Sequence, residues 1–150
     1  MINGTSRTSR LKTLAIAAAL SYAPQYLVAE TLDVAVAYYQ KEEFSKAFDI
    51  FLTLAKHQDA KAQFFVSAMY QSGKGVEQDE DKAFTWCKKA AEEGILEAQF
   101  QLGLMYLQGI GVTEDDDYAL EWIWAASDRG HPQAKETLQF ILESDFTTGC

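Results

Sequence analysis

The chain has 150 residues, of which 48% are hydrophobic, and a formal net charge of −9 from 13 basic and 22 acidic residues. This length fits one domain, and the apolar content is sufficient for a core. The acidic balance argues against nucleic acid as a partner, because phosphates are bound by Lys and Arg side chains. A basic protein, or a partner chosen without electrostatic preference, fits the charge better.

The N-terminal segment differs in charge from the rest of the chain. Residues 1–29 contain Arg7, Arg10 and Lys12 and no acidic residue, and an apolar run covers 14–20. A basic stretch before a short apolar stretch is typical of a secretory signal peptide. We therefore expect residues 1–29 to be removed and the mature protein to be periplasmic or secreted, with no stable membrane span after cleavage.

Two alternatives to a cleaved signal remain open. Cleavage after Ala29 places Leu27 where a small residue is preferred, and cleavage after Ala23 leaves Pro24 next to the cut. An uncleaved helix would make the protein an adaptor anchored in the inner membrane. An organellar transit peptide would also be acid-free and rich in Ser, Thr and Arg.

Residues 32–57 are expected to form a first helix hairpin. The turn is short, at residues 40–43, and lacks glycine. The apolar faces are supplied by aromatic residues, namely Tyr38, Tyr39, Phe44, Phe48 and Phe51.

An internal repeat with an offset of 36 residues follows. Residues 60–94 align with 96–130 without a gap, and the identical pairs are rich in Gly, Ala, Tyr and Trp. They include Ala62 with Ala98, Gln63 with Gln99, Tyr70 with Tyr106, Gly73 with Gly109, Gly75 with Gly111, Asp79 with Asp115, Ala83 with Ala119, Trp86 with Trp122, and Gly94 with Gly130. Self-similarity at this period is the signature of a solenoid.

The repeated positions predict one helix hairpin per unit. Ala62, Val66 and Tyr70 recur at helical spacing and mark the buried face of a first helix. Gly75 and Gly111 are expected at positive φ in the turn. Ala83, Trp86 and Ala90 mark the buried face of a second helix, with the indole as a core group.

A last helix begins at Pro132 and closes the array. The expected fold is thus all-α, an α-solenoid of antiparallel helix hairpins with about seven helices, over residues 30–145. Residues 146–150 are expected to form a disordered tail.

The repeated residues resemble a known family. The pattern of Ala62 and Gln63, Leu104 to Tyr106, Gly-x-Gly-Val, a capping Asp, Ala-x-x-Trp and a final Gly is similar to the Sel1-like repeat of the tetratricopeptide superfamily. The resemblance covers residues 60–143 and implies a right-handed superhelix of helix pairs that binds other proteins. It also implies a scaffold or regulatory adaptor of the bacterial cell envelope. In departures from the pattern, Ser67 replaces the glycine kept at Gly103, and Cys87 replaces a bulkier residue such as Ile123.

The acidic, histidine and cysteine side chains that could serve catalysis or metal binding are better explained by structural roles such as helix capping and packing. The acids of 79–81 and 114–117 stand at helix starts, where they cap N–H groups. His57 and His131 have no ligands at metal spacing, and Cys87 occupies a packing position typical of inert thiols. No catalytic residue, metal or cofactor is expected.

A different functional class stays as the alternative. Some cysteine-rich relatives of this repeat are described as β-lactam-binding, and Ser9 and Lys12 match the Ser-x-x-Lys spacing of penicillin-recognising enzymes. This match has no partner motifs, and the paired cysteines of that branch are absent. A small envelope hydrolase or β-lactam-binding protein is therefore the second hypothesis.

A partner-binding strip is predicted on the first helices of the hairpins. Tetratricopeptide geometry turns one stripe of each toward a concave groove, where a protein or peptide would bind. The predicted groove residues are Lys61, Phe64, Gln71, Glu97, Phe100, Leu104, Leu107 and Phe140, with Ala68, Gln133 and Glu136 beside them. If this stripe is core instead, Trp124 on the outer surface is the better interface residue.

Overall fold

The computed structural model describes residues 31–148, with side chains through Glu143. Within this range the chain has seven helical segments and no strand, as the repeat predicted. They are residues 31–40, α2 (Phe44–Lys56), α3 (Ala60–Ser72), α4 (Glu80–Glu92), α5 (Leu96–Gln108), α6 (Asp116–Asp128) and α7 (Pro132–Thr148). The segment predicted as a signal peptide lies outside the described residues, and α7 continues past residue 145, where we placed the end of the domain.

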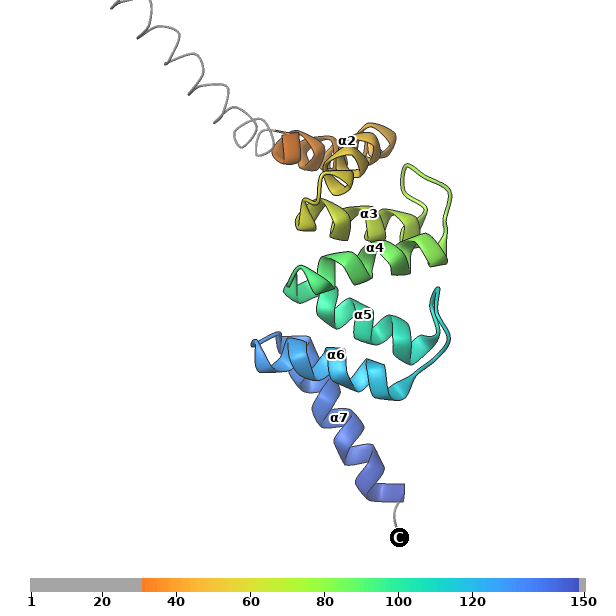
Figure 1. Cartoon of the computed structure of the whole chain (residues 1–150), viewed down its shortest axis with the longest axis vertical. Coiled ribbons are helices and arrows are strands. Elements are labelled where there is room, and N and C mark those ends of the chain that lie inside the picture. Colours follow the sequence, from red (N-terminus) through yellow and green to blue (C-terminus); the bar gives the residue numbers. More distant parts are fainter. Residues whose placement is uncertain (1–30, 149–150) are drawn as a thin grey trace, which may run out of the picture.

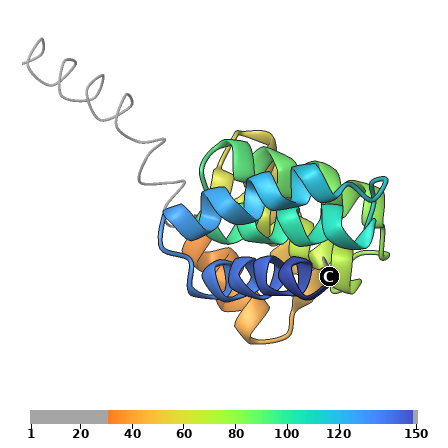
Figure 2. The same cartoon turned by 90° about the horizontal axis from the view of Figure 1, so that it is seen from below.

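Helices α2 to α7 are stacked in chain order, each packed against the next (Figure 1). Two longer loops, residues 73–79 and 109–115, lie on one edge, and the turns between successive hairpins, residues 57–59, 93–95 and 129–131, lie on the opposite edge. Figure 2 shows α7 running beside α6, against which it packs. No helix in the described range is long and apolar enough to span a membrane.

The longer loops contact the preceding hairpins through glycine. Gly75 and Gly111 have φ of 73° and 65°, which confirms the predicted turn conformation. A Cβ at Gly111 would lie 2.1 Å from the carbonyl oxygen of Glu80, and one at Gly75 would lie 2.4 Å from that of Phe44. Each loop therefore packs directly on the first turn of the second helix of the preceding hairpin, where a side chain has no room.

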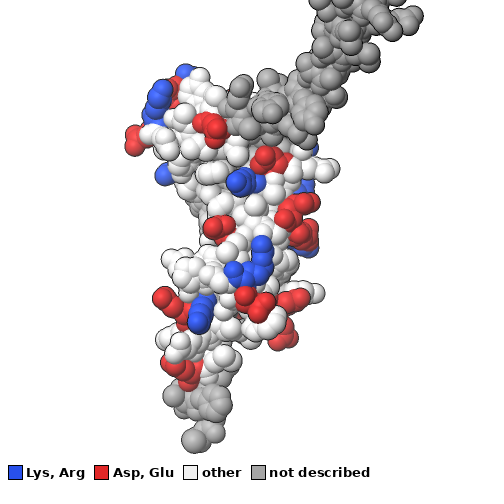
Figure 3. All heavy atoms as spheres, turned by 90° about the vertical axis from the view of Figure 1, so that its left-hand side faces the viewer, with Lys and Arg blue, Asp and Glu red and all other residues white. Residues whose placement is uncertain are grey.

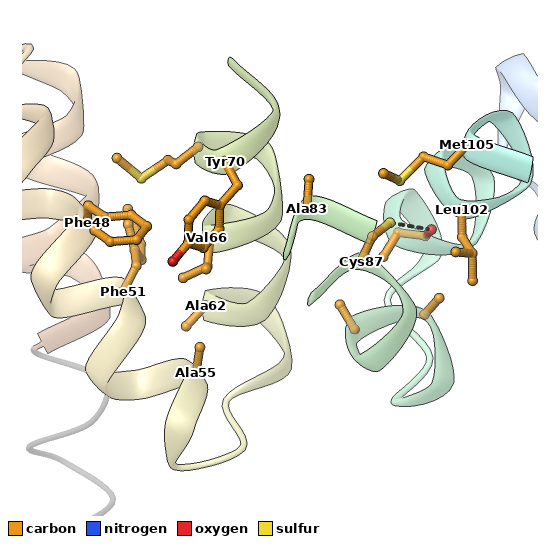
Figure 4. Packing of buried hydrophobic residues seen from close by; sticks show 14 of the residues in the cluster. Phe48, Phe51, Ala55, Ala62, Val66, Tyr70, Ala83, Cys87, Leu102 and Met105 are labelled. Atoms are coloured by element: carbon orange, nitrogen blue, oxygen red, sulfur yellow. Dashed lines mark hydrogen bonds between the residues drawn. The ribbon is translucent and has the colours of Figure 1, made fainter. Parts of the chain in front are cut away.

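Alanines on both helices of each hairpin form the centre of the core. Ala62, Ala83, Ala98, Ala119 and Ala134 are all fully buried. Larger side chains fill the space between them, including Phe51, Val66, Leu102 and Met105 (Figure 4). Small residues let neighbouring helices approach closely, so the larger side chains can interdigitate.

Two departures from the repeat compensate each other. Ser67 is buried, and its Oγ donates a hydrogen bond to the carbonyl of Ala83 at 2.7 Å. At the equivalent Gly103, a Cβ would lie 2.6 Å from Cγ1 of Ile123. A side chain at residue 67 is accommodated because Cys87, smaller than isoleucine, takes the place of Ile123.

The prediction that Trp86 and Trp122 fill the core was wrong. Both indoles are half-buried and pack on the margin of the core. The fully buried residues are their neighbours Cys87 and Ile123. Helical periodicity is satisfied equally well by the tryptophans and by the residues that follow them. In the structure, the side chains that point into the core are those of the following residues, Cys87 and Ile123.

Cys87 is a packing residue, as its position predicted. It is fully buried, and its Sγ donates to the carbonyl of Ala98 at 3.4 Å (Figure 4). Burial raises the pKa of the Cys87 thiol to about 12, against a smaller opposing effect of the hydrogen bond with Ser67. The thiol is therefore neutral in the folded protein near neutral pH.

We expect Gly111→Ala to destabilise the domain much more than Gly130→Ala. Both glycines have positive φ, which costs an alanine about 1 kcal/mol, but a Cβ at Gly130 meets nothing within 4 Å. The clash with Glu80 should bring the cost at Gly111 to at least about 3 kcal/mol. Urea denaturation followed by circular dichroism measures both values, and equal costs would contradict the close approach of loop and helix.

Cys87 should resist thiol reagents until the domain unfolds. In a Cys150→Ser variant at about pH 8, only about one Cys87 side chain in 10⁴ is ionised, and none of the thiol is accessible. Ellman's reagent should label it in denaturing urea within seconds, and in buffer only at the rate of unfolding. Rapid labelling of the native protein would show that this site opens locally.

Candidate functional site

A groove of about 580 Å³ crosses α3, α5 and the start of α7. It brings together residues that are far apart in the sequence. The sequence analysis placed many of them on one strip along the first helices of the hairpins. The lining residues are Phe64 from α3, Glu97, Phe100, Gln101 and Leu104 from α5, His131 from the preceding turn, and Gln133, Glu136 and Thr137 from α7. Six of these nine are residues that the sequence placed on or beside the strip.

The apolar surface of the groove is held in place by the core. Phe64 and Phe100 are half-buried and pack against the core clusters with one side. Leu104 is half-buried and belongs to neither cluster. Leu104 is therefore the apolar side chain whose exposed surface is least needed for folding.

His131 is a groove residue that sequence reasoning missed. Its ring lies against Phe100, with 4.6 Å between ring centroids, and its Nδ1 accepts a hydrogen bond from the Ala134 N–H at 3.2 Å. It thereby caps the start of α7 and fixes the angle between α7 and α5. The sequence signal was present, since His131 directly precedes a Pro-initiated helix, but it did not indicate the contact with Phe100.

The charge of the groove is negative. Glu97 and Glu136 both line it, and among the described residues in the lining there is no Lys or Arg. Gln101 donates a weak hydrogen bond from Nε2 to Oε1 of Gln71 at 3.4 Å, which places Gln71 beside the groove. The polar groups are mainly hydrogen-bond acceptors and amides, which suits a cationic or amide-bearing ligand.

Four other predicted residues lie elsewhere. Leu107 packs against the main core cluster, so the side chain is structural rather than part of the groove lining. Lys61 is exposed on α3. Phe140 is 72% exposed and Trp124 is 60% exposed. Trp124 contributes to a separate apolar depression of about 540 Å³ on the outer surface, together with Leu120, Leu138 and Leu142.

The acidic clusters cap helices, as the sequence predicted. Asp79 accepts a hydrogen bond from the Lys82 N–H, and Asp115 accepts one from the Tyr118 N–H. The hydrogen bond and ion pair with Lys82 lower the pKa of the Asp79 carboxyl. His57 lies against the carbonyl of Thr53 at the end of α2, with 2.8 Å between Nδ1 and the oxygen. In the described range, no group of three or more His, Cys, Asp or Glu side chains could hold a metal ion.

The structure describes only some of the residues that bear on the alternative hypothesis of a hydrolase or a β-lactam-binding protein. Ser9 and Lys12 lie outside the described residues. Cys87 is a free, buried thiol rather than half of a disulfide. The hypothesis of a hydrolase or a β-lactam-binding protein thus rests on residues that lie outside the described range.

Comparison with solved structures finds repeat proteins of the same architecture. A Sel1 repeat protein from Oxalobacter formigenes is 29% identical, with a TM-score of 0.68 over 72% of this chain and 44% of its own. The protein c5321, a protective antigen present in uropathogenic Escherichia coli strains, is 32% identical, with a TM-score of 0.72 over 82% of this chain and 27% of its own. This chain therefore spans less than half the length of either relative.

A third structure supports the fold alone. Helicobacter pylori cysteine rich protein B is 20% identical, with a TM-score of 0.65 over 91% of this chain and all of its own. No curated protein sequence matches the chain. The Sel1 repeat family model matches residues 60–95 and 96–131, the two units that the 36-residue offset defined. The chain is therefore a Sel1-repeat protein in the sense that residues 60–131 form two Sel1 repeats.

Proposed function

We propose that this protein is a non-catalytic adaptor that holds a segment of another protein in the groove across α3, α5 and α7. Sel1 repeats usually serve as protein-interaction scaffolds. The observation that carries the proposal is the groove itself. It exposes apolar side chains from two hairpins and is bordered by acidic groups from α5 and α7.

The groove favours a peptide with an apolar side chain next to a basic one. An apolar group placed on Phe64, Phe100 and Leu104 would be removed from water, and each such side chain contributes about 1.5–3 kcal/mol when fully buried. A Lys or Arg side chain beside it would meet Glu97 and Glu136. The net charge of −9 favours the approach of a basic segment over a longer distance.

We further propose that the adaptor works in the bacterial cell envelope after export. The basic segment of residues 1–12 and the apolar run that follows it support this location. One relative is described as a protective antigen, which also supports a location at or outside the cell surface.

Peptides selected from a displayed random library on the full chain test the groove. We expect the selected sequences to pair an aromatic or aliphatic residue with Lys or Arg. Leu104→Asp should weaken the binding of such a peptide at least about tenfold, corresponding to about 1.4 kcal/mol, because it places a charge against the apolar side chain. The affinity is measured by calorimetry, and circular dichroism checks that the variant is folded.

Trp124→Ala is the matched control, since it removes an exposed apolar side chain of the outer surface. It should leave the affinity of the same peptide unchanged. Loss of binding in Trp124→Ala with full binding in Leu104→Asp would move the interface to the outer depression and contradict the proposal.

A further inference from the structure

The two repeats treat one buried glutamine differently. Gln63 and Gln99 occupy the same repeat position, and each donates from Nε2 to a carbonyl at the end of the preceding helix, Ala55 at 3.4 Å and Ala91 at 3.2 Å. These hydrogen bonds fix both amides in the same orientation, with Oε1 directed away from the helix end.

In the second repeat, the glutamine oxygen binds an arginine of the chain itself. Arg129 Nη1 donates to Gln99 Oε1 at 2.9 Å and to the carbonyl of Gly94 at 2.9 Å. In the first repeat, Glu93 stands at the position of Arg129. Glu93 and Arg129 are the C-caps of α4 and α6, with φ and ψ of −76° and 0° against −83° and 4°. Their side chains therefore leave the backbone in the same direction.

Gln63 Oε1 consequently lacks the donor that Gln99 has. The Gln63 residue is only 4% exposed, and its Oε1 is a buried acceptor with no hydrogen-bond partner among the described residues. Burying such an oxygen without a donor costs about 1–3 kcal/mol. A group that supplied an N–H to this atom would recover that free energy.

Gln63 is one of the residues that line a cavity of about 440 Å³, which opens to the surface. Trp86 forms one wall, and Gln58, which has φ of 67°, stands at the repeat position of Gly94. Glu92 and Glu93 supply two carboxylates at the mouth. The cavity is on the edge of the short turns, where acidic and basic side chains are intermingled (Figure 3).

Two lysines, Lys56 and Lys89, also line this cavity. Lys89 Nζ lies 4.5 Å from the centroid of the Trp86 ring, and Lys56 stands at the end of α2. They balance the charge of Glu92 and Glu93, so the cavity does not attract every cation. A ligand must therefore be recognised by the geometry of its hydrogen bonds, which a planar guanidinium provides and an ammonium does not.

We propose that this cavity binds an arginine side chain of a partner protein, in the position that Arg129 takes in the next repeat. The guanidinium would donate to Gln63 Oε1 and to the carbonyl of Gln58, and it would pair with Glu93. This site shares no lining residue with the groove and does not depend on its function. It gives the protein a second, arginine-specific contact.

The probe is Nα-acetyl-arginine methylamide, titrated into the ¹⁵N-labelled full chain. We expect saturable shifts of the Gln63 side-chain amide and the Trp86 indole N–H, with much smaller shifts at Gln99 and Trp122, where Arg129 already fills the position. The corresponding lysine and citrulline methylamides should bind at least about tenfold more weakly. Equal binding of all three, or no shift at Gln63 and Trp86, would overturn the proposal.

Glu93→Arg supplies the guanidinium from within the chain. We expect it to abolish the shifts caused by the arginine probe and to raise the thermal midpoint by a few degrees, because Gln63 Oε1 gains its donor. Glu93→Gln is the matched control, which removes the charge without filling the cavity. It should keep the probe bound, with an affinity only several-fold lower. Unchanged probe binding in Glu93→Arg would show that the probe binds elsewhere and contradict the proposed site.

Discussion

The close approach of helices within each hairpin is the constraint on which the rest of the structure depends. It requires small residues where two backbones meet, and the chain places Ser67 opposite Ala83 and Gly103 opposite Ala119. Gly75 and Gly111 impose the same requirement between hairpins, since each loop lies directly on the backbone of the preceding unit. Once these contacts are set, the direction of each first helix is fixed. The groove across α3, α5 and α7 follows from that repeated geometry.

In a repeat array of this kind, we expect binding sites at the positions where one repeat carries a different residue from the next. Most alanines and glycines recur at equivalent positions of the two units, whereas Glu93 and Arg129 are opposite in charge on the same backbone geometry. One unit therefore satisfies its buried glutamine from within, and the other leaves Gln63 Oε1 as an acceptor. The groove likewise depends on elements outside the two repeats, because His131 and α7 line one side of it. The contacts common to both units build the scaffold, and the contacts that differ between them give it a surface that a partner can distinguish.

The sequence predicted the fold well because the fold depends on residue type at fixed spacing. The 36-residue offset predicted seven helices, the positive φ at Gly75 and Gly111, and a first-helix stripe that the structure brings together around Phe100. It failed at Trp86 and Trp122, since periodicity alone does not decide which of two adjacent residues points inward. It also could not assign Leu107 to the core or His131 to the groove, because both depend on how α7 and the neighbouring hairpins pack. The contrast between Glu93 and Arg129 is visible in the sequence, but the atoms that each side chain reaches are not.

The close approach within a hairpin can be measured directly at Gly103 and Ile123. A double-mutant cycle compares Gly103→Ser, Ile123→Cys and the double variant, which reproduces the Ser67–Cys87 pair of the preceding unit. Gly103→Ser alone should cost about 1–3 kcal/mol of unfolding free energy, because its Cβ would overlap Cγ1 of Ile123. The account predicts that Ile123→Cys relieves this overlap and gives a favourable coupling energy of at least about 1 kcal/mol. Strictly additive costs in urea denaturation would show that the two positions do not share one space, and would contradict the packing on which this account rests.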